Sequence, residues 1–145
     1  MKLGVPMEPA GETRVAIAPS SLKKLLKAGF EVLVEKGAGI ASNNLDADYV
    51  SAGAKITSRE EVLSCETIIS IRFPGIEGIS KGSRIACVAD PFRNPEHVNS
   101  CIAAGITLLS MDMIPRRLSR AQSMDVNSSQ DNLAGYKAVL LGAAH

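Results

Sequence analysis

Residues 84–111 read RIACVADPFRNPEHVNSCIAAGITLLSM, and this stretch indicates the fold. It opens and closes with apolar runs of strand length, 84–89 and 106–111, and it places Pro95 where the first turn of a helix tolerates proline. Two apolar strands joined through a helix are the unit from which parallel sheets are built. We therefore expect a β-α-β unit here, with strands buried on both faces.

The same alternation extends toward the N-terminus. Ser20 or Ser21 can cap a helix that stops at Gly29, and Ser58 with Glu61 matches a capping box. The sequence thus predicts one α/β domain: a doubly wound, mainly parallel sheet of flavodoxin-like (Rossmann-like) type that ends in a long helix. The expected strands are 2–5, 30–35, 54–57, 67–71, 84–89 and 106–111.

Composition argues against several classes of function. The 145 residues carry 16 Lys and Arg against 15 Asp and Glu, so the formal net charge is only +1. This balance, with 3% aromatic residues and no tryptophan, argues against nucleic acid as a partner. No apolar run approaches the ~20 residues of a membrane helix, so direct membrane insertion is not expected.

The cysteines and histidines suggest no metal chemistry. Cys65, Cys87 and Cys101 lack CxxC spacing and lie among apolar neighbours, which predicts buried, inert thiols in a reducing compartment. His97 and His145 lack the companions that a metal site or a catalytic triad requires. We therefore expect no bound metal.

Residues 112–138 read DMIPRRLSRAQSMDVNSSQDNLAGYKA. An acidic residue and a proline precede an Arg-x-Ser-x-Ala-Gln-x-x-Asp-x-x-Ser-Ser run, and Asn-x-Ala-Gly-Tyr-Lys-Ala follows it. This pattern resembles the NAD(H)-binding alpha subunit of proton-translocating NAD(P) transhydrogenases. Residues 4–19 and 35–39 are similar to the opening that transhydrogenases share with alanine dehydrogenases, so the resemblance covers effectively the whole chain.

The resemblance also implies a division of the chain. Residues 1–126 would form the N-terminal lobe of the alanine dehydrogenase/transhydrogenase type, with loop 112–126 facing the nicotinamide. Residues 127–145 would begin a long helix that leads to an NAD-binding domain outside this chain. No Gly-x-Gly-x-x-Gly fingerprint follows a strand in the sequence, which agrees with that division. The isolated chain is accordingly expected to be inactive.

By motif position, the resemblance implies that Arg117, Gln122 and Asp125 are catalytic residues that also bind the cofactor. It implies Ser128 and Arg14 as further cofactor-binding residues. An arginine can hold a carboxylate or pyrophosphate oxygen, and a glutamine can both donate to and accept from a carboxamide such as that of nicotinamide. Asp125 could orient Arg117 or accept from the nicotinamide amide.

Two of these residues have a structural alternative. Ser128 could equally be the N-cap of the helix that follows it. Arg14 could form an ion pair with Glu12 or Glu8. A plain turn is the interpretation of the Gly-x-Gly at 37–39, which lacks a third glycine.

The activity implied by the resemblance is hydride transfer from NADH to NADP+, coupled to proton movement. NAD(H) would be the cofactor, and NADP(H) would lie on a partner component. The expected partners are that NADP(H)-binding component, a membrane proton channel component, and a second copy of the chain in a homodimer. The expected location is the cytoplasm, or the matrix-equivalent side of an organelle, peripheral to a membrane complex.

Other residues depart from the family pattern. Ser70 and Asp90 stand where alanine dehydrogenases have a lysine and a histidine, although Arg72 could present a charge on the same strand face as Ser70. Asn127 and Asp131 replace residues that are usually small or apolar. Two alternatives stay open: the substrate lobe of an alanine dehydrogenase-like oxidoreductase, and a non-catalytic, stand-alone interaction module.

Overall fold

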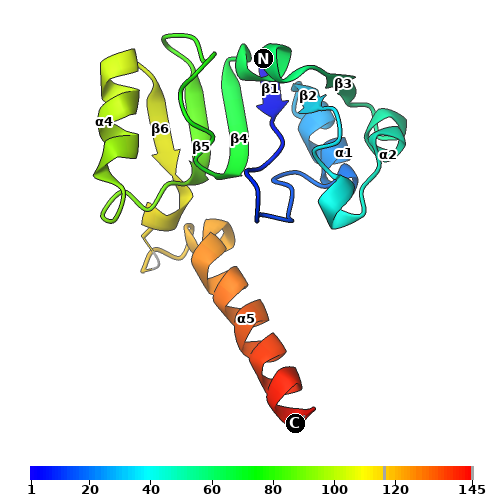
Figure 1. Cartoon of the computed structure of the whole chain (residues 1–145), viewed down its shortest axis with the longest axis vertical. Helices are drawn as coiled ribbons and strands as arrows, with labels where there is room; N and C mark the ends of the chain where they lie inside the picture. Colours follow the sequence, from blue (N-terminus) through cyan, green and yellow to red (C-terminus); the bar gives the residue numbers. More distant parts are fainter. Residues whose placement is uncertain (116, 145) are drawn as a thin grey trace.

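The computed structural model describes residues 1–115 and 117–144. Within these residues, six parallel strands form one sheet in the order β3-β2-β1-β4-β5-β6 (Figure 1). Each predicted strand is present, and its bounds differ from the expected ones by no more than a single residue at either end. The strands are β1 (Lys2–Val5), β2 (Glu31–Glu35), β3 (Lys55–Thr57), β4 (Thr67–Arg72), β5 (Arg84–Val88) and β6 (Thr107–Ser110).

Helices connect all consecutive strands except β4 and β5, which are joined by a loop, and a long helix follows the last strand, as predicted. The α-helices are α1 (Pro19–Lys27), α2 (Asp46–Ser51), α3 (Arg59–Leu63), α4 (Pro95–Ala104) and α5 (Val126–Ala143). The short 3-10 helices within residues 1–115 and 117–144 are η1 (Ile40–Ser42), η2 (Met111–Met113) and η3 (Gln122–Met124).

Helices cover both faces of the sheet, which confirms a doubly wound α/β fold. Along β2, Val32 and Val34 pack with Leu22 of α1 in one cluster, whereas Leu33 between them packs with Val62 of α3 in another. This alternation is the consequence of side chains on a strand pointing to opposite faces.

The strand order follows the Rossmann pattern and not the flavodoxin pattern, in which the third strand would cross to the far side of β1. Here β3 pairs with β2 instead, at the outside of the sheet. The short β3 is exposed at Lys55 and only half-buried at Ile56 and Thr57, so it suits an edge. The more deeply buried β4 takes the central place beside β1.

The two predicted helix caps differ in their outcome. Ser20 and Ser21 lie inside the first turn of α1, which begins at Pro19, so the prediction that they cap the helix was wrong. Proline has a fixed φ that suits the first helical position and needs no hydrogen bond there. Ser58 is the N-cap of α3, and its hydroxyl accepts the backbone N–H of Glu61.

Helix α5 extends away from the edge of the sheet at which the strands end (Figure 1). Its residues from Ser128 onward are exposed up to residue 144, including the large apolar side chains of Leu133, Tyr136 and Val139. Only its first turns lie near the sheet, so few contacts set its direction. In the described part of the chain, no helix is long and apolar enough to span a bilayer.

Candidate functional site

The loops after β1, β4, β5 and β6 meet at one edge, because parallel strands all end on the same side of a sheet (Figure 1). Ligands of open α/β sheets bind at this edge, near the point where the strand order reverses. In this sheet the reversal lies between β1 and β4. The candidate site is therefore built from the carboxyl ends of these strands and the start of α5.

Glu8, in the loop after β1, binds the backbone at the end of β4. Its carboxylate accepts the backbone N–H of Ile71 at 2.6 Å and that of Arg72 at 2.9 Å. These bonds satisfy two donors at the end of β4 and fix the loop that follows β1. Glu35, at the end of β2, accepts the N–H of Met7 in the same loop at 2.8 Å. Two carboxylates from different strands thus shape this loop.

Glu12, in the loop after β1, pairs with two arginines at the carboxyl edge of the sheet. Arg14 donates from Nη2 to Oε2 at 2.6 Å and from Nε to Oε1 at 2.7 Å, and Arg72 donates from Nε to Oε2 at 3.2 Å. The hydrogen bonds from Arg14 lower the pKa of Glu12 from 4.5 to about 2, against the opposing effect of burial. Arg14 therefore forms the ion pair with Glu12 that is one of the two interpretations of this residue; its contact with a cofactor stays a prediction.

Arg14 also reaches the last helix. Its Nη1 donates to Oε1 of Gln130 in α5 at 2.7 Å. The two residues are 116 positions apart in the sequence, so no local pattern could have revealed this contact.

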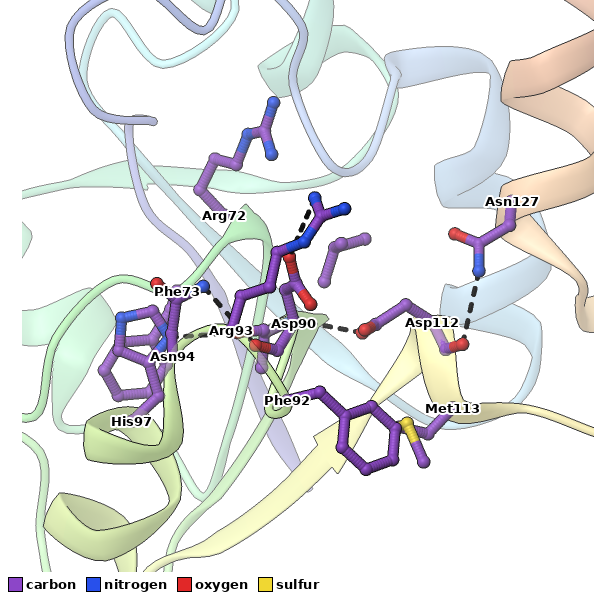
Figure 2. A pocket seen from close by; sticks show the side chains of 12 residues that line it. Arg72, Phe73, Asp90, Phe92, Arg93, Asn94, His97, Asp112, Met113 and Asn127 are labelled. Atoms are coloured by element: carbon purple, nitrogen blue, oxygen red, sulfur yellow. Dashed lines mark hydrogen bonds and ion pairs between the residues drawn. The ribbon is translucent and has the colours of Figure 1, made fainter.

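A cavity of about 630 Å³ lies beside this network (Figure 2). It is bounded by the ends of β4 and β5, the start of α4, and Asn127 at the start of α5. Arg117, Gln122, Asp125, Ser128 and Arg14 are not among its lining residues. The polar and aromatic side chains that line it are Arg72, Phe73, Asp90, Phe92, Arg93, Asn94, His97, Asp112 and Asn127.

His97 is the residue of this cavity that sequence reasoning undervalued. Its Nδ1 lies 3.0 Å from the carbonyl oxygen of Ala89, and its ring stacks on Phe73 with centroids 4.3 Å apart. A carbonyl only accepts, so Nδ1 carries the hydrogen in this contact. The available signal was position, because His97 lies in the first turn of a helix that starts at the carboxyl edge.

Asp90 has an unusual backbone at the end of β5. Its φ of 45° lies in the left-handed region, which aspartate tolerates better than most residues. Its carbonyl accepts the N–H groups of Arg93 and Asn94, and its carboxylate lies 3.7 Å from Nη1 of Arg93. Asp90 therefore shapes a tight turn at the position where alanine dehydrogenases are expected to have a histidine.

Ser70, the second position at which the sequence departs from alanine dehydrogenases, lies inside the fold. Its side chain is buried, and its hydroxyl has no hydrogen-bond partner among residues 1–115 and 117–144. Arg72 at the end of the same strand is exposed and pairs with Glu12. Across the described residues, no group of three His, Cys, Asp or Glu side chains is arranged to hold a metal ion.

The loop between η2 and α5 carries Arg117 and Gln122. Both residues are exposed, and neither side chain has a hydrogen bond or ion pair with another described residue. Between them, Ala121 is 6% exposed and its N–H donates to the carbonyl of Leu118 within the loop, and the loop is anchored at its end by Asn127, which donates to the carbonyl of Asp112. The anchored loop thus presents a guanidinium and a carboxamide to the solvent.

The other two predicted residues of this loop bind each other. Asp125 is the N-cap of α5, and its carboxylate accepts the N–H of Ser128 at 3.0 Å and the hydroxyl of Ser128 at 2.6 Å. The interpretation of Ser128 as the cap was wrong, because Asp125 occupies that position three residues earlier. The Asp125 carboxylate also interacts favourably with the positive end of the helix dipole.

Comparison with known proteins places this geometry in a family. Residues 4–134 match the family described as "Alanine dehydrogenase/PNT, N-terminal domain". An NAD(P) transhydrogenase alpha-subunit polypeptide of Rhodospirillum rubrum is 40% identical over 154 residues, an alignment that spans 99% of this chain and 40% of that protein. The NAD(P) transhydrogenase subunit alpha of Haemophilus influenzae is 38% identical over 149 residues, which span 100% of this chain and 29% of that protein.

Two solved structures have the same fold. A transhydrogenase from Sinorhizobium meliloti is similar with a TM-score of 0.94 and 38% identity, over 99% of this chain and 44% of the other. An L-alanine dehydrogenase is similar with a TM-score of 0.77 and 28% identity, over 83% of this chain and 34% of the other. The chain thus spans less than half the length of these proteins. It belongs to the alanine dehydrogenase/PNT N-terminal domain family and is homologous to the N-terminal part of the NAD(P) transhydrogenase alpha subunit.

Proposed function

We propose that this chain is the first lobe of the NAD(H)-binding component of a proton-translocating transhydrogenase. The observation that carries the proposal is the anchored loop, in which Arg117 and Gln122 are exposed and have no partner among the described residues. An exposed guanidinium and carboxamide at the carboxyl edge of the sheet are groups that can bind a ligand without first breaking a contact. The homology to transhydrogenase subunits supports the choice of ligand.

The chemistry of these side chains fits the nicotinamide end of NAD(H). A glutamine can donate to and accept from a carboxamide at the same time, and an arginine can hold a phosphate or carboxylate oxygen in two parallel bonds. When bound, the nicotinamide would carry the hydride, so the protein needs no nucleophile of its own. Gln122 and Arg117 would orient the ring, and Asp125, held by Ser128, would present a carboxylate beside them.

Most of the binding free energy for the dinucleotide would come from elsewhere in the protein. The sequence has no Gly-x-Gly-x-x-Gly fingerprint, and the transhydrogenase relatives are more than twice as long as this chain. We infer that α5 leads toward such a dinucleotide-binding domain. A direct contact between Arg14 and the cofactor stays a prediction. Arg14 would make that contact either alongside its hydrogen bonds to Glu12 or in their place.

The exposed position of the loop also suits transfer between components. Hydride donor and acceptor must approach to about 3–3.5 Å, so a second nicotinamide has to reach the same place. We propose that an NADP(H)-binding component docks over this loop and that a membrane component couples the transfer to proton movement. Assembly of two copies of this chain stays a prediction.

The test is Gln122→Asn in the complete native protein. The shorter side chain keeps the amide but withdraws it by one methylene, so single-turnover hydride transfer should slow by roughly tenfold to a hundredfold, the cost of a misplacement near 1 Å. NADH affinity should change less, because other groups supply most of it. Asn99→Gln, the reverse change on the exposed face of α4, is the control and should leave both quantities unchanged. A normal single-turnover rate in Gln122→Asn would exclude this role for Gln122.

An alanine dehydrogenase-like activity is the second candidate, because the similarity to an L-alanine dehydrogenase extends over 83% of the chain. Two observations count against it. Ser70 is buried and uncharged where a lysine is expected, and Asp90 pairs with Arg93 where a histidine is expected. Alanine-dependent formation of NADH by the complete protein would favour this candidate, and its absence would favour transhydrogenation.

A further inference from the structure

The first turns of α5 are joined to the sheet by two side chains on one helix face. Asn127 donates from Nδ2 to the carbonyl oxygen of Asp112 at 3.2 Å, and Gln130 accepts from Arg14 at 2.7 Å. Residues three apart in a helix are neighbours on one face, so both contacts point toward the carboxyl edge of the sheet. We call these four residues the clasp.

Asp112, the residue that Asn127 contacts, is itself held by the ends of two strands. The Asp112 carboxylate accepts the N–H of Ala89, at the end of β5, at 3.2 Å. The same oxygen accepts the hydroxyl of Ser110, at the end of β6, at 2.6 Å. Figure 2 shows Asn127 reaching Asp112 from the helix while the Asp112 carboxylate points toward the strand ends. Asn127 therefore binds a residue that two strands hold in place.

The contact between Asn127 and Asp112 closes the base of the loop that carries Arg117 and Gln122. The two residues are 15 positions apart and lie at the two ends of that loop. The contact is partly buried, whereas the one between Arg14 and Gln130 is exposed, so solvent weakens the first less. From Leu133 to residue 144 the side chains of α5 are exposed.

We propose that the clasp orders this loop and that Asn127 is a positioning residue for Arg117 and Gln122. A loop with both ends fixed loses less conformational entropy when it binds a ligand, so the clasp raises affinity without touching the ligand. The resemblance leads one to expect a small or apolar residue at position 127, and an apolar side chain has no donor for Asp112 while a small one is shorter than asparagine. The clasp would therefore be a feature of this chain. Its effect on NADH, although not its effect on the loop, rests on the proposed function.

The experiment is Asn127→Asp in the complete native protein, read by limited trypsin digestion. The change keeps the size of the side chain but replaces the donor with a carboxylate that faces the Asp112 carbonyl oxygen. Cleavage after Arg117 and Arg120, located by mass spectrometry, should become about fivefold faster, which corresponds to the loss of one hydrogen bond. An acidic residue in the first turn favours the helix dipole, so a weaker helix cannot account for that result.

Two further variants complete the design. Gln130→Ala removes the exposed contact and should accelerate cleavage less than Asn127→Asp does. Asn99→Asp introduces the same charge on the exposed face of α4 and should be cleaved like the wild type. Cleavage of Asn127→Asp at the wild-type rate would overturn the proposal.

The functional readout separates this inference from the proposed function. Asn127→Asp should lower single-turnover hydride transfer at saturating NADH in the same direction as Gln122→Asn but by less, because a less ordered loop holds Gln122 and Arg117 in place for a smaller part of the time. An unchanged single-turnover rate at saturating NADH would overturn the positioning role. If the proposed function is wrong, Gln122→Asn will transfer hydride normally while Asn127→Asp still accelerates cleavage of the loop.

Discussion

The Arg14 guanidinium holds the Glu12 carboxylate in a two-bond geometry, with Nε–Oε1 at 2.7 Å and Nη2–Oε2 at 2.6 Å. The Glu12 side chain is only 8% exposed, whereas that of Arg14 is 44% exposed. These hydrogen bonds are the main reason that the pKa of Glu12 is lowered to about 2, and burial acts in the opposite direction. Glu12 also pairs with Arg72, so it connects the loop after β1 to the end of β4.

The first prediction concerns Glu12 and pH. A carboxyl group with a lowered folded-state pKa stabilises the fold above its unfolded value near 4.5, and this contribution is lost as pH falls toward 2. Wild-type protein should exceed Glu12→Gln in stability by roughly 1–2 kcal/mol at pH 7, a value reduced because Arg14 is partly solvated. Urea unfolding at pH 7, 4.5 and 3 should show the gap shrinking. Glu77→Gln, on an exposed loop, is the control, and a gap independent of pH would contradict the prediction.

The second prediction concerns Tyr49, the largest fully buried side chain among the described residues. Its hydroxyl donates to the carbonyl of Ile17 at 3.0 Å, which ties α2 to the segment before α1. Tyr49→Phe leaves that carbonyl without this donor and should lower the free energy of unfolding by about 1–2 kcal/mol. Tyr136→Phe, on a residue 67% exposed in α5, should change it by less than about 0.5 kcal/mol. Equal urea midpoints for the two variants would show that the buried bond contributes nothing.

The fold is largely predictable because local signals agree with it. Continuous apolar runs indicate all six strands, and the spacing of Ser58 and Glu61 identifies the cap of α3. The strand order is not predictable in the same way. It depends on whether β3 pairs with β2 or crosses to the other side of β1, and the burial of a three-residue strand is decided by tertiary packing and not by periodicity.

The candidate site is predictable only to a limited extent. The family pattern locates Arg117 and Gln122, and the structure leaves both exposed on an anchored loop. The contacts that shape the edge join distant positions: Glu8 binds Ile71 across 63 residues, and Arg14 binds Gln130 across 116. Sequence spacing carries no information about such pairs. Asp125 and Ser128 are both good capping residues in the same short segment, so local sequence alone does not distinguish them.

The third prediction uses two glycines with opposite surroundings. A Cβ at Gly4 in β1 would overlap the backbone carbonyl oxygen of Val62 in α3, which cannot move without displacing the helix. Gly4→Ala should therefore destabilise the protein by about 1–3 kcal/mol. A Cβ at Gly135 in α5 would meet nothing within 4 Å, so Gly135→Ala should raise helix content through a gain of about 1 kcal/mol in local propensity. Circular dichroism and urea unfolding measure both effects, and destabilisation by Gly135→Ala would mean that α5 is covered in the native protein.

The last prediction concerns the thiols. Cys65, Cys87 and Cys101 are each at most 2% exposed, and burial raises the pKa of Cys87 to about 12, with a further rise caused by Cys101. Because the thiolate is the reactive form, these cysteines should resist iodoacetamide in the native protein at pH 8 and react only when urea exposes them. Peptide-level mass spectrometry gives the rate for each residue, and Ser80→Cys, at an exposed position, supplies a freely reactive reference. If Cys87 were alkylated in the native protein as fast as the reference, the sheet would have to open between β5 and α4 far more often than its fully buried packing implies.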